Sequence, residues 1–244
     1  MPRAEARDVR VEHDLLGERE IPAHAYWAVH TLRAVENFPI TGRWIGLWPE
    51  LVRALALVKH AAAQTNYELG LLDETKAKLI IAACREIADG ALHDEFVVDM
   101  IQGGAGTSTN MNANEVIANR ALELAGRKKG DYAFLHPIEH VNMAQSTNDV
   151  YPTALRLALR FAIVDLIAAM EELKVAFAAK SVEFRDLLKV GRTQLQDAVP
   201  MTLGQEFSTF AVMLGEDQQR LAEAGALIEE INLGATAIGT GINS

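Results

Sequence analysis

Apolar residues recur at helical spacing along most of the chain after residue 48, and this pattern predicts its main elements. Gly70 is expected to close the first helix as a C′ glycine, and Asp73 to cap the start of the second. Gly126 is expected to end the third. These three helices are predicted over residues 51–69, about 73–89 and about 113–125.

Two longer periodic runs follow. Pro152 opens the first, which reaches Lys189 and would form a rod of roughly 55 Å at 1.5 Å per residue. The second run extends from Met201 to Ile231. Two long amphipathic helices in one chain predict a helical bundle. The first 45 residues are expected to be irregular, and no stretch shows the alternation typical of a strand.

The predicted fold class is therefore all-α. A mixed N-terminal helical domain, residues 1–149, is expected to precede the first long helices of a central bundle, residues 150–244. We expect this second domain to be incomplete, because its wide apolar stripes have few partners within the chain.

Composition and charge exclude several classes of protein. The chain has 23 basic and 33 acidic residues, a net charge of -10, which argues against nucleic acid as a partner. Cys84 is the only cysteine, so no intrachain disulfide can form and a reducing compartment is expected. The first residues are charged and lack the apolar run of a signal peptide, and no uncharged apolar stretch is long enough to span a membrane. We expect a cytoplasmic protein that contacts no membrane.

Three clusters rich in hydroxyl and carboxamide groups interrupt the apolar pattern, and each lies just upstream of a predicted helix. Helix N-termini present unpaired N–H groups and partial positive charge, so they receive anions. Three such termini brought together would suit a small dicarboxylate. Ser, Thr, Asn and Asp in these positions also serve as plain N-caps, and the residues alone leave that reading open. The clusters are residues 103–112, 145–149 and 191–197.

Other candidate sites have weaker support. His136 and His140 are spaced like a pair of metal ligands, but no further Cys, His or carboxylate group completes a zinc pattern, so no metal site is expected. The glycine-rich stretch 103–106 lacks the GK[ST] of a P-loop and the strand that precedes a dinucleotide-binding turn. Met111 and Met143 are expected to be packing residues.

The polar clusters carry a resemblance to a known family. Residues 106–115 read GTSTNMNANE, residues 140–149 read HVNMAQSTND, and residues 191–207 read GRTQLQDAVPMTLGQEF. These blocks resemble the aspartase/fumarase superfamily, and the resemblance covers essentially the whole chain. It implies a helical fold, a small dicarboxylate substrate and a homotetramer in the full-length form. It also implies that three subunits build each active site, so that the three clusters would meet only across chains.

Within that superfamily the chain is most similar to the aspartate ammonia-lyases. Residues 12–18 (EHDLLGE) and 30–38 (HTLRAVENF) look like the aspartase blocks, and position 194 is Gln where fumarases carry His. One departure concerns residues 136–140 (HPIEH), where the family often reads His-Pro-Asn-Asp-His. That stretch forms a secondary dicarboxylate-binding spot in fumarases, so the loss of the Asn argues against such a spot here.

The resemblance implies an elimination of ammonia from L-aspartate through an aci-carboxylate intermediate. It assigns the β-carboxylate to Thr107, Ser146 and Thr147, and the α-carboxylate to Thr147 and Asn148. It places Asn148, Thr193 and Gln194 around the amino group. No cofactor is implied, and activation by a divalent cation such as Mg²⁺ is not readable from the sequence.

The general base that the resemblance implies is a serine on a loop reading Gly-Ser-Ser-x-x-Met-Pro-x-Lys-x-Asn, and the 244 residues contain no such pattern. The chain alone is therefore expected to be an inactive portion of a lyase. The alternatives are a fumarate hydratase, or a non-catalytic helical module that binds dicarboxylates or a full-length relative.

Overall fold

The computed structural model describes residues 8–102 and 104–243, and the chain divides into two compact units. The first unit comprises the described residues up to Ala158 together with those from Ile231 on. The second unit is Leu159–Glu230. Gly103, part of the first polar cluster, lies outside the described residues. The domain boundary expected after residue 149 stays a prediction.

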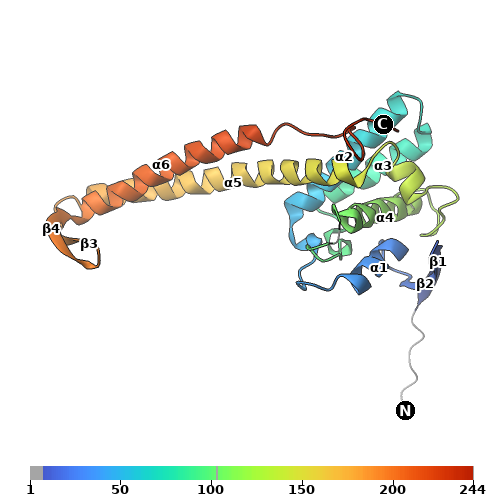
Figure 1. The fold of residues 1–244 in the computed structure, drawn as a ribbon, viewed down its shortest axis with the longest axis horizontal. Helices are drawn as coiled ribbons and strands as arrows, with labels where there is room; N and C mark the ends of the chain where they lie inside the picture. The colour runs from blue at the N-terminus through green and yellow to red at the C-terminus, as the bar shows by residue number, and fades with distance from the viewer. Residues whose placement is uncertain (1–7, 103, 244) are drawn as a thin grey trace, which may run out of the picture. The chain divides into compact units, whose positions relative to one another are not determined.

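The first unit is built mainly from helices (Figure 1). Its α-helices are α1 (Val29–Asn37), α2 (Pro49–Glu68), α3 (Glu74–Ala88), α4 (Thr107–Leu124) and the beginning of α5 (Thr147–Glu183). Its short helical turns are η1 (Ile45–Leu47), η2 (His93–Glu95) and η3 (Pro137–Val141), and its strands are β1 (Val9–Asp14) and β2 (Gly17–Pro22).

Helices α2, α3 and α4 supply most of the core of this unit, where fully buried side chains such as Leu55, Ile80 and Ile117 pack together. The predicted ends of the first two helices are confirmed. Gly70 follows α2 with φ +73°, the left-handed conformation of a C′ glycine, and the Asp73 side chain accepts from the Lys76 N–H at the start of α3.

The first 45 residues contain regular structure, so the expectation that they are irregular was wrong. Strands β1 and β2 form an antiparallel hairpin with Val9 opposite Pro22, and α1 follows it. The short alternation Val9-Arg10-Val11-Glu12 in β1 does not mark the buried face, because Val11 is exposed whereas Glu12 is buried. Two-stranded hairpins with little buried apolar surface leave a weak signal in the sequence.

Helices α4 and α5 both begin earlier than the apolar pattern predicted. The buried face of α4 near its start is polar, and Asn110, Asn112 and Asn114 are nearly or fully buried there. A search for apolar residues therefore places the start too late. Pro152 lies inside α5 rather than at its beginning, and the helix starts at Thr147.

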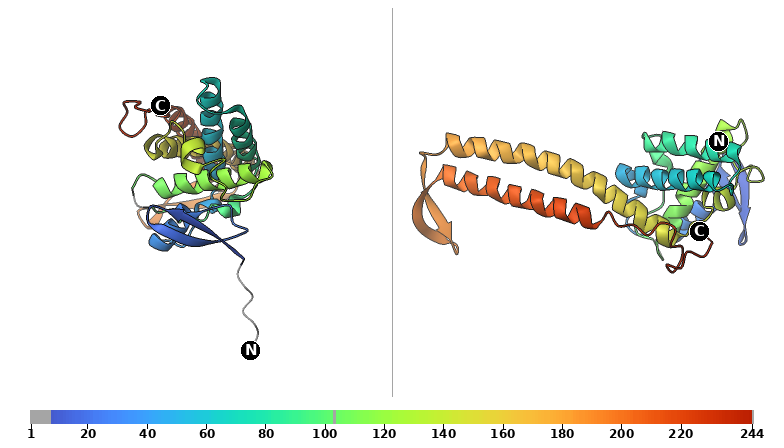
Figure 2. Two further views of the ribbon diagram at one scale, coloured as in Figure 1. Left: turned by 90° about the vertical axis from the view of Figure 1, so that its right-hand side faces the viewer. Right: turned by 90° about the horizontal axis from the view of Figure 1, so that it is seen from above.

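The second unit consists of the rest of α5, strands β3 (Leu188–Thr193) and β4 (Gln196–Thr202), and helix α6 (Leu203–Leu227). Figures 1 and 2 show α5 and α6 running side by side in opposite directions, joined by the hairpin. Four aromatic rings pack between the two helices next to the hairpin, those of Phe177, Phe184, Phe207 and Phe210. The hairpin was also missed by the sequence analysis.

The predicted fold class is confirmed, because long helices dominate and the strands within residues 8–102 and 104–243 form only two short hairpins. Among the described residues, no helix combines the length and the apolar character that crossing a membrane requires.

Candidate functional site

The first two polar clusters meet in space at the beginnings of α4 and α5. Thr107 is the first residue of α4, and Thr147 is the first residue of α5. The two helix starts are joined by a hydrogen bond of 3.2 Å, in which the Asn110 carboxamide donates to the Thr147 hydroxyl oxygen. The first two clusters are therefore neighbours within one chain, although the resemblance implied that the clusters meet only across subunits.

Gly106 allows this close approach. It is the N-cap of α4 with φ +83°, a conformation that side chains other than glycine rarely adopt. A Cβ atom built on it would lie only 2.6 Å from ring carbons of Tyr151 in α5. A glycine is required here both by the backbone conformation and by the contact.

Ser146 is the N-cap of α5, so the plain capping role that the sequence left open is realised here. Its hydroxyl oxygen accepts from the Asn148 N–H at 3.3 Å, and the Asp149 carboxylate accepts from the Ser146 N–H at 3.1 Å. This reciprocal pair resembles a capping box and fixes the first turn of the helix.

The hydroxyl groups of Ser146 and Thr147 keep hydrogen-bonding capacity beyond these structural contacts. In these contacts the oxygens of Ser146 and Thr147 each accept one hydrogen bond from the protein, and each O–H proton can still be donated. Both hydroxyls lie at the positive end of the α5 dipole. The start of α5 therefore has the chemistry needed to bind a carboxylate without a charged side chain in direct contact.

The candidate residues of this unit line separate cavities. Asn148 lines a cavity of about 510 Å³ with Gly104, Gly106 and Tyr151, so both clusters contribute to it. Ser146 lines a cavity of about 430 Å³ beside the segment that begins at Thr236. A third cavity, of about 200 Å³, contains Thr107, Ser108, His30 and Arg33.

Thr193 and Gln194 belong to the second unit, at the tip of the β3–β4 hairpin. Thr193 pairs with Gln196, which leaves Gln194 and Leu195 as a two-residue loop. The third cluster thus lies in a hairpin upstream of α6, and strand β4 separates its tip from the start of that helix. Both loop residues have positive φ, +52° and +62°, in positions that usually favour Gly or Asn. Strain of this kind clusters at functional sites.

A buried lysine, which the sequence analysis missed, donates hydrogen bonds to the second cluster and to the residues just before it. Lys59 in α2 has no exposed surface, and its ammonium donates to Asn142 Oδ1 and Gln145 Oε1, both at 2.8 Å. Burial lowers the pKa of Lys59 to about 7, while Cys84 and Asp149 nearby act in the opposite direction. Asn110 and Asn114 donate to the same Asn142 oxygen. This network fixes the residues directly before Ser146.

One feature of the sequence could have indicated the network around Lys59. Lys59 interrupts the apolar run of α2 at a position on the buried face of the helix, where a lysine is rare unless it has partners. Its partners could not be read from the sequence, because Asn142 and Gln145 are more than 80 residues away.

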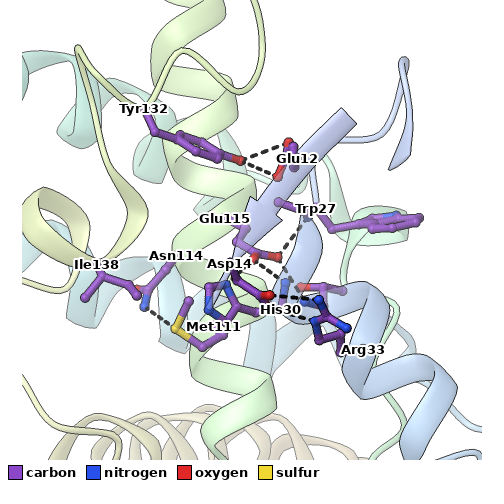
Figure 3. Close-up of polar contacts among 12 residues, drawn as sticks. Glu12, Asp14, Trp27, His30, Arg33, Met111, Asn114, Glu115, Tyr132 and Ile138 are labelled. Carbon is purple, nitrogen blue, oxygen red and sulfur yellow. Dashed lines mark hydrogen bonds and ion pairs between the residues drawn. The ribbon is translucent and has the colours of Figure 1, made fainter. Parts of the chain in front are cut away.

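A second buried network fixes α1 against α4 (Figure 3). The Glu115 carboxylate is fully buried and accepts from the N–H groups of Ala28, His30 and Thr31 at the start of α1. The same carboxylate contacts the His30 ring at 3.0 Å, which raises the pKa of His30. This anchor places His30 beside the cavity that contains Thr107.

The ring nitrogens of His136 and His140 make several contacts within the chain. His136 Nδ1 accepts from the N–H groups of Ile138 and Glu139, and His140 Nδ1 accepts from the His136 N–H. His140 Nε2 lies 2.8 Å from the Lys76 ammonium. Burial lowers the pKa of both imidazoles. In the part of the chain that the structure describes, no group of three or more metal-binding side chains gathers.

Comparison with known proteins gives consistent results. The model of the family described as Lyase matches residues 17–244. Aspartate ammonia-lyase from Pseudomonas aeruginosa is 61% identical over 236 residues, which is 96% of this chain and 50% of that protein. Aspartate ammonia-lyase from Escherichia coli (strain K12) is 53% identical over 240 residues, 98% of this chain and 50% of that protein. The chain thus spans about half the length of the curated relatives it matches.

Solved structures with the same fold include a cobalt-bound fumarate lyase:delta crystallin from Brucella melitensis. It has a TM-score of 0.92 and 59% identity, and the match covers 97% of this chain and 51% of that one. A recombinant class II fumarase from Schistosoma mansoni has a TM-score of 0.88 at 36% identity, and the match covers 96% of this chain and 49% of that one.

Proposed function

This chain belongs to the lyase family, and from that premise we propose that the whole protein is an aspartate ammonia-lyase, which eliminates ammonia from L-aspartate to give fumarate. The observation that carries the proposal is the identity of 53–61% to aspartate ammonia-lyases over nearly all of the chain. The identity to the class II fumarase is 36%. Gln194, where fumarases carry His, favours the same choice.

The reaction breaks the C3–H and C2–N bonds of aspartate and forms the C2–C3 double bond of fumarate. A base takes the C3 proton, and the negative charge moves onto the β-carboxylate, which becomes an aci-carboxylate. The ammonia then leaves with the electron pair of the C2–N bond. Because the C3 proton is weakly acidic, the site must present preorganised donors to the oxygens on which the charge develops.

The start of α5 supplies such donors. Ser146 and Thr147 would hold the β-carboxylate through hydroxyl protons that their structural hydrogen bonds leave available. Thr107, at the positive end of α4, lines a separate cavity of this chain and would join them in the assembled site of the tetramer. These roles are supported by the meeting of the two helix starts, and they make no use of a charged side chain.

Asn148 follows Thr147 directly and would bind the α-carboxylate together with it, and the amino group of the substrate as well. Thr193 and Gln194, at the hairpin tip of the second unit, would complete the contacts to the amino group from another subunit of the tetramer. Their exposure and the positive φ of Gln194 support a role in binding rather than in packing.

We further propose that the whole protein is a homotetramer, with each active site assembled from three subunits. The general base would be a serine on a loop of the whole protein, and the 244-residue chain would not turn over substrate by itself. A cytoplasmic location, the absence of a cofactor and the role of a divalent cation stay predictions.

The direct test is a stoichiometry experiment with the purified whole protein and L-aspartate. Fumarate, followed by its ultraviolet absorbance, and ammonia, followed by a coupled assay, are expected to appear in a ratio of one to one. Fumarate formation without ammonia, or no fumarate at all, would refute the proposed elimination.

A further inference from the structure

A single buried carboxylate joins the start of α5 to the last part of the chain. Asp149 has no exposed surface. Its Oδ1 accepts from the Ser146 N–H at 3.1 Å, and its Oδ2 accepts from the N–H groups of Gly234 at 3.2 Å and Thr236 at 2.9 Å. Hydrogen bonds to a charged acceptor are the stronger kind, and Asp149 makes three of them.

Two further hydrogen bonds join the neighbouring residue, Asn148, to the last part of the chain. The Asn148 carboxamide donates to the Ala237 carbonyl at 2.7 Å, and the Asn232 carboxamide donates to the Asn148 carbonyl at 3.2 Å. That carbonyl is available because its usual helical partner would be the N–H of residue 152, and Pro152 has none. The proline inside α5 therefore creates an acceptor for the incoming segment.

Both sides of this junction hold strained backbone. Thr236 has φ +56°, and Ala144, which precedes the second cluster, has φ +58°. Residues other than glycine keep such conformations only where the surroundings fix them. At Thr236 the hydrogen bond from its N–H to Asp149 is one such constraint.

The segment fixed in this way forms one wall of a cavity of about 430 Å³. Gln145 and Ser146 form the opposite wall, and Thr236, Thr240 and Asn243 lie on the side of the segment. The volume falls within the range of about 300–1,000 Å³ that is common for small-molecule sites. The Thr236 hydroxyl is bonded to the Ala235 carbonyl, so this residue contributes mainly its backbone.

We propose that Asp149 is a positioning residue of the substrate site, which holds residues 234–240 against Ser146 and Asn148 so that this segment forms the second wall around the bound dicarboxylate. The inference rests on the proposed function, because it takes the ligand of Ser146 to be the substrate. Asp149 itself does not touch the substrate. Its effect passes through the backbone of Ser146, Gly234 and Thr236.

The test compares Asp149→Asn with the unmodified whole protein. Succinate, a saturated dicarboxylate that cannot undergo elimination, is titrated by calorimetry, and the kinetics with L-aspartate are measured in parallel. The carboxamide keeps the shape but loses one acceptor oxygen. The Kd for succinate and the KM for aspartate are expected to rise together by at least about tenfold, with a smaller change in kcat, because the hydrogen bonds that hold the segment to a charged group are weakened.

Asp73→Asn is the matched control, because Asp73 also accepts a backbone N–H but caps α3 and lies outside the cavity. It is expected to leave Kd and KM unchanged. If Asp149→Asn does not fold, Asn232→Ala is measured in its place. Asn232 is exposed, and the change removes its hydrogen bond to the Asn148 carbonyl. The Kd for succinate and the KM for aspartate are then expected to rise severalfold.

The outcomes separate the two claims. An unmodified protein that binds succinate but does not convert aspartate refutes the proposed function and leaves the role of Asp149 in dicarboxylate binding to be judged from Kd. The inference is overturned if the unmodified protein is active and Asp149→Asn leaves Kd and KM unchanged. Where Asp149→Asn does not fold, unchanged Kd and KM in Asn232→Ala overturn it instead. A lower Tm with unchanged Kd and KM would show that Asp149 serves stability alone.

Discussion

The carboxamide of Asn110 donates a hydrogen bond to the hydroxyl of Thr147 at 3.2 Å, and this contact joins the first turns of α4 and α5. Asn110 is nearly fully buried, so the bond is shielded from water. The two helix N-termini are thereby held together, and each adds partial positive charge to the same region. A carboxylate bound there would be stabilised by both helices.

The substitution Asn148→Ala in the whole protein is expected to lower kcat/KM for aspartate by roughly 10²–10³, because it removes one preorganised donor and also breaks the hydrogen bond to the Ala237 carbonyl. The fold should persist, since Asn148 is exposed and the change leaves the helix intact. Steady-state kinetics together with circular dichroism measure both effects.

Gln64→Ala is the matched control for Asn148→Ala. It removes a carboxamide that pairs with Glu68 on an exposed part of α2. Unchanged kinetics are expected for this variant. Near-normal kcat/KM in Asn148→Ala would remove Asn148 from the site.

The substitution Gly106→Ala is expected to destabilise the protein more than Gly70→Ala does. Both glycines have positive φ, so both changes incur the cost of a left-handed residue, about 1–2 kcal/mol. Only at Gly106 would the added methyl group also collide with the Tyr151 ring, since no atom lies within 4 Å of a Cβ at Gly70. The Tm values of the two variants measure the difference, and equal values would disprove the contact between the two helices.

The burial of Lys59 predicts a rise of stability with pH. The folded pKa is about 7 and the ordinary value is 10.5, so between these pH values the unfolded chain binds a proton that the folded chain does not. The free energy of unfolding therefore increases with pH across this window, by on the order of 1 kcal/mol per pH unit, and the cost of burying the charge is fully present below pH 7.

Thermal unfolding of the unmodified protein and of Lys59→Met at several pH values tests this linkage. The methionine variant cannot titrate at this position, so the Tm difference between the two proteins should shift in favour of the unmodified protein as pH rises from 7 to 9. A difference that does not depend on pH would mean that Lys59 stays charged in the folded state.

The 244-residue chain by itself is expected to associate in solution. Exposed apolar side chains lie along α5 and α6 in the second unit, among them Val164, Leu166, Leu173, Val182, Phe210, Val212 and Met213. A contiguous exposed apolar surface above a few hundred Å² promotes association, and at about 25 cal/mol per Å² covering it is worth several kcal/mol. Light scattering at several concentrations measures the mass. A constant 26.7 kDa would contradict the expectation.

The sequence predicted the helices well where apolar residues mark the buried face, as in α2 and α3. It placed the start of α4 too late because Asn110, Asn112 and Asn114 are buried there. It missed the β1–β2 hairpin because Glu12 occupies the buried position of β1 and Val11 is exposed. The local pattern of apolar residues predicts which apolar side chains are buried, but it does not predict the burial of polar side chains.

The candidate site also has features that the sequence predicted and features that it did not. The polar clusters that contain Thr107, Ser146, Thr147 and Asn148 are local features of the sequence, whereas the roles of these residues come from the resemblance and stay predictions. The ties from Lys59 to Gln145 and from Asp149 to Thr236 join residues that are 86 and 87 positions apart in the chain. Only the folded structure reveals them.

The most direct test of the proposed function compares kcat/KM of the purified whole protein for L-aspartate and for L-malate, with fumarate as the common product. The assignment of Gln194 to the amino-group side of the site and the identity to aspartate ammonia-lyases predict a strong preference for aspartate. Faster formation of fumarate from malate would contradict the account and favour a fumarate hydratase.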